Sequence, residues 1–164
     1  MMTKLQQILR LALLLLLATS TVTAFKKAGG VEFPDKFKGS SLVKTGVRSK
    51  GPIKVYAVGQ YGKTFLLQMT YGVSTSKMTS ALKAALSPRC GGNKKMVEEF
   101  ESLMLKGLPN GVPKGTKLAF GTSGGKLSLN VNGKNVGAIE SKPLASAFER
   151  IYTDGNAVCK MKPV

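Results

Sequence analysis

The stretch that decides the fold reads IKVYAVGQY and occupies positions 53–61. Its side chains alternate between two faces, as they do along a β-strand. Val55 and Ala57 fall on one face. Lys54, Tyr56 and Val58 fall on the other. We therefore expect a β-strand over this stretch.

Similar runs lie on either side of this strand, at 41–47 and 65–73. The pair Gly51-Pro52 marks a turn between the first run and the central one. Three successive strands with short connections favour an antiparallel meander.

Three helices are predicted by apolar residues spaced three and four positions apart. The first follows the serine and threonine residues at 74–76, which can cap its N-terminus, and ends before Pro88. The second begins after Asn93 and the third after Ser141, each of which is a residue type that caps helices well. The apolar stripes of these helices are most simply core residues.

Further strands are predicted at 116–121, 126–131 and 135–140. The dipeptide Asn132-Gly133 is typical of a tight hairpin turn between the last two. The order of elements is strands, helices, strands, helix. This order favours an α+β fold, in which an antiparallel sheet is covered by helices.

The N-terminal residues 1–24 have the organisation of a secretory signal peptide, with basic residues, the apolar run Leu11–Ala18 and small residues at the end. The apolar run is too short to span a bilayer. We expect cleavage between Ala24 and Phe25, which leaves residues 25–164 as one domain.

The signal peptide predicts entry into the secretory pathway and then secretion. The junction between Ala24 and Phe25 also resembles the cleavage site of presequences that route proteins into complex plastids. A plastid is therefore the second candidate compartment. The folded domain is expected to begin near Val31, which leaves a very short basic stretch with Lys26 and Lys27 to act as a transit peptide.

Composition excludes several kinds of site. The chain has no histidine, so it lacks Ser-His-Asp and Cys-His catalytic arrangements and the zinc helix with two histidines. Two cysteines alone cannot complete a thiolate zinc site. No glycine-rich phosphate loop lies between a strand and a helix. We therefore predict neither a metal nor a cofactor.

The chain is strongly basic, with 25 Lys and Arg against 8 Asp and Glu and a formal charge of +17. Such a field attracts nucleic acid, anionic membranes or acidic partners. The lysines are scattered and are not interleaved with aromatic residues, which disfavours nucleic acid. A solvated lysine surface is the simplest interpretation, and an anionic membrane surface is a candidate partner.

The two cysteines, Cys90 and Cys159, lie far apart in the sequence. A secretory route permits a disulfide between them. Spacing alone does not show that they meet, so two free thiols are the alternative.

A family resemblance is carried by segments between residues 31 and 162. They are TGVR at 45–48, KVYAVGQY at 54–61, VSTSKM at 73–78, and the runs 108–109, 114–116, 125–134, 137–139 and 144–152. Their order and spacing resemble the chalcone isomerase family. The resemblance implies an open-faced β-sandwich, in which a long antiparallel sheet and a helical layer enclose a ligand cleft.

Two functions are implied by this resemblance. Chalcone isomerases close a flavonoid ring with an arginine that holds an oxyanion and with a threonine, a tyrosine and an asparagine around a water. The similar fatty-acid-binding proteins of plastids keep the arginine and pair it with a tyrosine that holds a carboxylate. Arg48 matches the arginine of both groups, and Tyr56 replaces the threonine, as in the binders. Lys77 and Ala84 stand where the catalytic tyrosine and asparagine are expected.

The sequence therefore favours a protein that binds a fatty acid or similar amphipathic carboxylate. Arg48 and Tyr56 are the predicted ligand-binding residues, and Tyr61 is the competing tyrosine. The first alternative is an intramolecular lyase, an isomerase that acts on a flavonoid-like enone, with Arg48 as oxyanion holder. The second is a basic membrane-surface module without a small ligand.

Overall fold

The computed structural model describes residues 3, 4, 6 and 24–164. The predicted signal peptide, residues 1–24, lies outside the described residues apart from positions 3, 4, 6 and 24. Among the described helices, none combines the length and the hydropathy needed to cross a bilayer.

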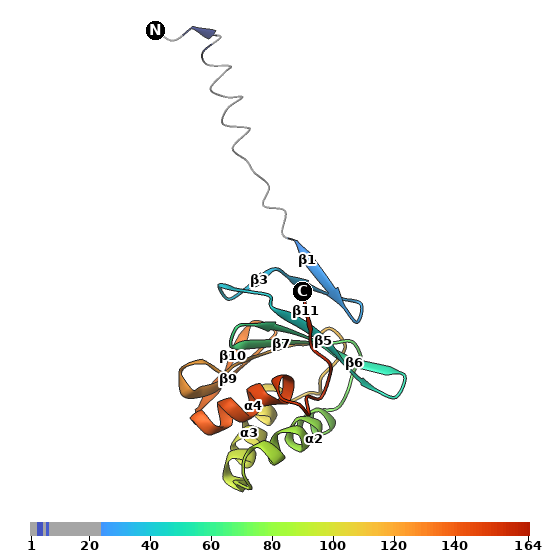
Figure 1. Ribbon diagram of the computed structural model, residues 1–164, viewed down its shortest axis with the longest axis vertical. Coiled ribbons are helices and arrows are strands. Elements are labelled where there is room, and N and C mark those ends of the chain that lie inside the picture. Colours follow the sequence, from blue (N-terminus) through green and yellow to red (C-terminus); the bar gives the residue numbers. More distant parts are fainter. Residues whose placement is uncertain (1–2, 5, 7–23) are drawn as a thin grey trace.

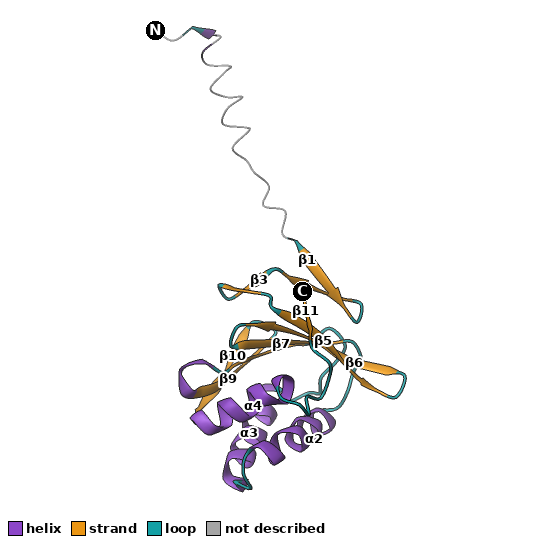
Figure 2. Cartoon of the chain, viewed as in Figure 1, coloured by secondary structure: helices purple, strands orange, loops and turns teal. Residues whose placement is uncertain are grey.

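A seven-stranded sheet, antiparallel throughout, forms the centre of the molecule (Figures 1 and 2). The strand order is β10-β9-β8-β7-β6-β5-β11. The strands are β5 (Lys44–Lys50), β6 (Ile53–Tyr61), β7 (Thr64–Met69), β8 (Lys117–Gly121), β9 (Lys126–Val131), β10 (Lys134–Glu140) and β11 (Lys162–Pro163). The prediction of an α+β fold with an antiparallel meander is confirmed.

Three helices cover one face of the sheet (Figure 2). They are α2 (Thr75–Leu86), α3 (Lys94–Gly107) and α4 (Lys142–Thr153), with short 3₁₀ turns at η1 (Ser87–Arg89) and η2 (Ser123–Gly125). Ser74, Asn93 and Ser141 cap the three helices, as predicted. In each case the side-chain oxygen accepts a hydrogen bond from a first-turn backbone N–H at 3.2 Å, which satisfies a donor that has no partner inside the helix.

Two short hairpins cover the opposite face, and sequence alternation did not predict them. They are formed by β1 (Phe25–Ala28) with β2 (Val31–Pro34), and by β3 (Lys36–Phe37) with β4 (Ser40–Ser41). Ordered pairing thus begins at Phe25 and not near Val31. The reason is that β1 is mostly exposed and is held by its backbone pairing with β2, which leaves no periodic pattern in its side chains.

The strand predicted at 65–73 is too long. β7 ends at Met69, because the backbone N–H groups of Thr70 and Tyr71 turn to the carbonyl of Val55. Tyr71 is exposed, and Val73 pairs instead with Val112 in an isolated bridge. Apolar side chains therefore continue the period of two beyond the point where sheet pairing stops.

The sheet separates two apolar clusters of unequal size. Tyr56 and Val58 belong to the larger cluster under the helices, while Ala57 and Tyr61 belong to the smaller one under the hairpins. Rings from strands and helices fill the larger cluster, and the centroids of Phe120 and Phe148 are 4.4 Å apart. Side chains thus occupy much of the space in which the family resemblance implies a cleft.

Candidate functional site

Arg48 and Tyr56 lie directly opposite each other in the pairing of β5 with β6. Cross-strand partners project to the same face of a sheet, so both belong to the face that the helices cover. Tyr56 is only 4% exposed, whereas Arg48 is exposed at the rim. The two predicted ligand-binding residues are therefore neighbours, one inside the core and one at its edge.

The hydroxyl of Tyr56 forms a buried hydrogen bond with the hydroxyl of Tyr152 on α4, at 3.1 Å. Burial raises the pKa of Tyr56 to about 12 and raises the pKa of Tyr152 well above its usual value. Both side chains are consequently neutral phenols at physiological pH. The pair has two hydroxyl protons, and the hydrogen bond between the two hydroxyls uses one of them. The other proton can be donated to another acceptor.

The guanidinium of Arg48 donates a hydrogen bond through Nη1 to the carbonyl oxygen of Val158, at 2.7 Å. Its positive charge is also close enough to oppose the rise in pKa of Tyr56, Tyr152 and Cys159. Arg48, Tyr56, Tyr152 and Cys159 therefore lie close enough together for the charge of the guanidinium to act on the other three side chains. A guanidinium offers five donors, so a single bond to a neutral carbonyl leaves most of its capacity for an anion.

The C-terminal residues 154–164, here called the strap, run across the rim beside Arg48. The strap ends in β11, which pairs with β5, and the N–H of Val158 donates to the carbonyl of Ile151 at 3.0 Å. It lies so close to Gly46 that a Cβ there would be 2.6 Å from Sδ of Met161 and 3.1 Å from the carbonyl oxygen of Lys160. Gly46 thus permits the strap to close over the site.

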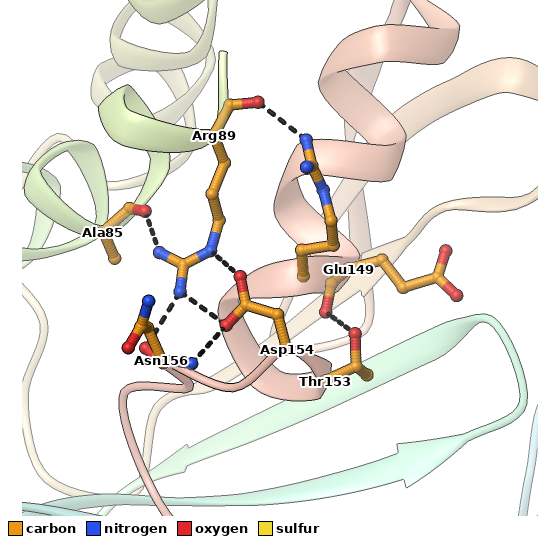
Figure 3. Close-up of polar contacts among 7 residues, drawn as sticks. Ala85, Arg89, Glu149, Thr153, Asp154 and Asn156 are labelled. Carbon is orange, nitrogen blue, oxygen red and sulfur yellow. Dashed lines mark hydrogen bonds and ion pairs between the residues drawn. The ribbon is translucent and has the colours of Figure 1, made fainter. Parts of the chain in front are cut away.

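Arg89 holds the start of the strap (Figure 3). Its Nε and Nη2 donate to the two carboxylate oxygens of Asp154 at 2.8 and 2.9 Å, and Nη2 also donates to the carbonyl of Asn156. This contact raises the pKa of Arg89 and lowers that of Asp154. Arg150 adds a hydrogen bond from its Nη2 to the carbonyl of Arg89. The network connects η1, the end of α4 and the strap.

Tyr61 lies on the other face of the sheet, and this corrects its prediction as a competing residue of the same site. It is five positions after Tyr56, and an odd separation along a strand places two side chains on opposite faces. Its hydroxyl donates to the carbonyl of Pro34 at 2.7 Å, and its ring packs on Phe37 with centroids 5.5 Å apart. Burial and the nearby Asp35 raise its pKa to about 12.

Cys90 and Cys159 are both buried and both free, so the structure corresponds to the alternative of two free thiols and not to a disulfide. Cys90 directly follows η1. Burial raises the pKa of its thiol, and the positive charge of Arg150 reduces this rise without cancelling it. Cys159 lies in the strap, its Sγ 3.9 Å from Sδ of Met161, and burial raises its pKa to about 11. Each thiol packs against its own neighbours and stays protonated at physiological pH.

The residues at the positions of the isomerase pair do not join this group. Lys77 and Ala84 are both exposed on α2. Lys77 lines an open surface hollow of about 380 Å³ together with Tyr71 and Asn110. A second open hollow, of about 680 Å³, lies between α3 and β10. Arg48 and Tyr56 line neither of these hollows.

Sequence reasoning missed Tyr152 and the strap as parts of the site. The position of Tyr152 four residues after Phe148 and eight after Leu144 places it on the apolar face of α4. Periodicity could therefore have shown that it faces the sheet, although not that it meets Tyr56. Among the described residues, no group of three carboxylate or thiol side chains is arranged to hold a metal ion.

Comparison with known proteins shows the fold. No protein-family model matches the chain, and no curated protein matches it. The crystal structure of a fatty-acid binding protein from Arabidopsis thaliana superposes with a TM-score of 0.74 at 20% sequence identity, over 83% of this chain and 92% of that one. The chain thus has a chalcone isomerase-like fold, and the predicted open-faced β-sandwich is confirmed.

Proposed function

We propose that this chain binds a fatty acid or a similar amphipathic carboxylate, with its carboxylate at Arg48 and its chain under the helices. The observation that carries the proposal is the cross-strand pair of Arg48 at the rim and Tyr56 in the core. The shared fold with a fatty-acid binding protein supports it.

The carboxylate would take the place of the Val158 carbonyl on the guanidinium of Arg48. A carboxylate accepts two parallel hydrogen bonds from this planar fork, and such charge-assisted bonds are roughly twice as strong as bonds between neutral groups. The second interaction comes from Tyr56, which donates its hydroxyl proton to the ligand while it accepts a hydrogen bond from Tyr152. The strap lies over this position, so it has to shift as the ligand enters.

The acyl chain would run along the helix-covered face, where Met69 is the cross-strand partner of Tyr56 on its other side. Met78 and Leu82 of α2 belong to the same buried cluster. Methionine side chains are unbranched and flexible, so they can move to accommodate a chain that enters a closed core. Each methylene that the chain buries contributes about 0.8 kcal/mol.

Retention of lipid by the purified protein tests the proposal. We expect extraction followed by mass spectrometry to recover fatty acid from the wild type, and Arg48→Ala to lower the affinity for added fatty acid by at least about tenfold. Arg48→Lys keeps the charge without the fork and should give an intermediate loss. Lys50→Ala is the matched control, because Lys50 is an exposed cation on the same strand.

Equal binding by wild type, Arg48→Ala and Lys50→Ala would refute the proposed carboxylate site. The intramolecular lyase is the alternative, since Arg48 and Tyr56 could also stabilise an oxyanion. Turnover of a chalcone panel that is lost in Arg48→Ala would favour that alternative. The exposure on α2 of Lys77 and Ala84, which stand at the positions of the catalytic tyrosine and asparagine, favours binding over that alternative.

A further inference from the structure

Basic residues gather in one part of the molecule. Residues 24–54 and 160–164 contain ten basic side chains and two acidic ones, whereas residues 55–159 contain thirteen basic and six acidic ones. The first set makes up the two hairpins, β5, the first two residues of β6 and the end of the strap. In Figure 1 the hairpins and the C-terminus lie on the side of the sheet away from the helices, whereas Arg48 of β5 belongs to the helix-covered face. The helices lie on the other side of the sheet (Figure 2).

Acidic partners pair with three of the thirteen basic residues in the second set. Ion pairs join Lys63 to Glu149, Lys83 to Glu101 and Arg89 to Asp154. Of the ion pairs found in the described residues, one lies in the hairpin layer, between Lys27 and Glu32 at 3.3 Å. The first set has fewer acidic residues for each basic one, so the hairpin layer and the strap end carry a higher density of positive charge.

Exposed apolar side chains accompany these lysines. Phe25, Val43 and Val164 are 53%, 46% and 51% exposed. Backbone hydrogen bonds connect their segments. The N–H of Asp35 donates to the carbonyl of Ala24 at 3.1 Å, that of Leu42 to Asp35 at 2.8 Å, and that of Val164 to Val43 at 3.2 Å. The three apolar residues thus share one end of the molecule.

We call this surface the basic-apolar end. It is defined by Phe25, Val43 and Val164 with four exposed lysines of the adjoining segments, Lys36, Lys38, Lys160 and Lys162. In the part of the chain that the structure describes, these four lysines take no part in an ion pair. Their charges are available to an external anionic partner.

We propose that the basic-apolar end binds the surface of an anionic lipid bilayer. Lysines attract the negative surface of such a bilayer over about a Debye length, and apolar side chains enter the boundary between headgroups and acyl chains. Charge complementarity selects the bilayer over a neutral partner. The exposed aliphatic side chains of Val43 and Val164 favour a bilayer over nucleic acid, because nucleic-acid surfaces are typically rich in arginine and in aromatic side chains that stack on bases. The proposal is independent of fatty-acid binding.

Co-sedimentation with vesicles tests this surface. The wild type is compared on phosphatidylcholine vesicles with and without phosphatidylglycerol, at low and high salt. Because an apolar leader can itself bind lipid, each variant is made both in the full chain and in the chain that begins at Phe25. Circular dichroism establishes that each variant is folded.

Charge reversal at Lys36, Lys38, Lys160 and Lys162 to Glu should lower partitioning onto the anionic vesicles by at least about 100-fold, since each lysine near such a surface contributes roughly a factor of five. The matched control reverses four exposed lysines of the helices, Lys94, Lys95, Lys106 and Lys142, and has the same net charge. It should lower partitioning by less than about tenfold. If the first set does not fold, the same four lysines are changed to Gln.

Replacement of both Phe25 and Val43 by Ser should weaken binding by about tenfold without changing its salt dependence. Equal losses in the two charge-reversed variants would overturn the proposal, because net charge alone would then explain the binding. The proposal would also be overturned if vesicle binding required residues 1–24 and was unchanged in both charge-reversed variants. Tighter binding to duplex DNA that is insensitive to Phe25 and Val43 would overturn it as well.

Discussion

The two faces of the sheet each bury a tyrosine from the same strand, and only one of the two tyrosines has a hydrogen-bond donor to spare. Tyr61, under the hairpins, donates its hydroxyl proton to the carbonyl of Pro34. Tyr56, under the helices, shares one hydrogen bond with Tyr152, so the pair retains a second proton. Both tyrosines have a pKa raised to about 12, so burial does not distinguish them.

What distinguishes the faces is the group beside each tyrosine. Arg48 is the cross-strand neighbour of Tyr56, whereas Asp35 is the charged residue whose field reaches Tyr61. A cation and an available O–H donor suit an anionic headgroup, and an acidic neighbour does not. The helix-covered face is therefore the one on which we propose the carboxylate site.

The largest effect is expected from a methyl group added on either face. Gly59→Ala would place a Cβ 2.7 Å from Cδ1 of Phe33, and we expect a loss of about 1–3 kcal/mol in unfolding free energy, measured by urea denaturation. Gly46→Ala pushes on the strap instead, where the end of Met161 can move. Gly46→Ala should lower the unfolding free energy by less than Gly59→Ala does, and it should speed backbone hydrogen exchange in residues 158–164. Unchanged exchange there would contradict the close packing of the strap.

A smaller effect is expected from removing each hydroxyl. Tyr61→Phe leaves the Pro34 carbonyl without its partner and should lower the unfolding free energy by about 1–2 kcal/mol, with fatty-acid affinity unchanged. Tyr56→Phe should lower stability by about 1 kcal/mol and fatty-acid affinity by about tenfold. A fluorescent fatty-acid displacement assay measures the affinities. If both variants bind equally well, the distinction between the two faces fails.

The smallest effect concerns stability in alkali. The pKa of both tyrosines is raised from 10.0 to about 12 by folding, so their contribution is present below pH 10 and is lost as pH rises toward 12. Each Tyr→Phe variant at these two positions should therefore lose less stability than the wild type between these pH values. Urea denaturation at a series of pH values measures the slopes. Identical slopes in all three proteins would show that these phenols do not titrate with folding.

Most regular elements could be predicted because their signals are local. The period of two at 53–61 and the caps Ser74, Asn93 and Ser141 act within one strand or one helical turn. The pairing of Arg48 with Tyr56 was not predicted, because the register of their strands shifts between Arg48 and Ser49 and the short turn alone does not show this shift. The hairpin layer escaped prediction because β1 is held by backbone pairing and carries no side-chain period.

The contacts that complete the site join residues far apart in the chain. Tyr152 meets Tyr56 across 96 positions, and Val158 meets Arg48 across 110. Spacing does not report such contacts, and the same limit left the state of Cys90 and Cys159 open until the structure showed both thiols free. Strand alternation alone places Tyr61 on the face opposite Tyr56. This placement could have been predicted from the sequence, but Tyr61 was still kept as a candidate for the same ligand site.

The sequence by itself determined the α+β class and the order of strands and helices, because alternation, capping and short turns operate over a few residues. Only the tertiary structure decided that Arg48 and Tyr56 are cross-strand partners, that α4 brings Tyr152 to Tyr56, that the strap crosses Arg48, and that lysines and apolar residues from both ends of the chain meet on one surface. These arrangements depend on how layers pack, and packing brings together residues whose separation along the chain carries no signal of contact.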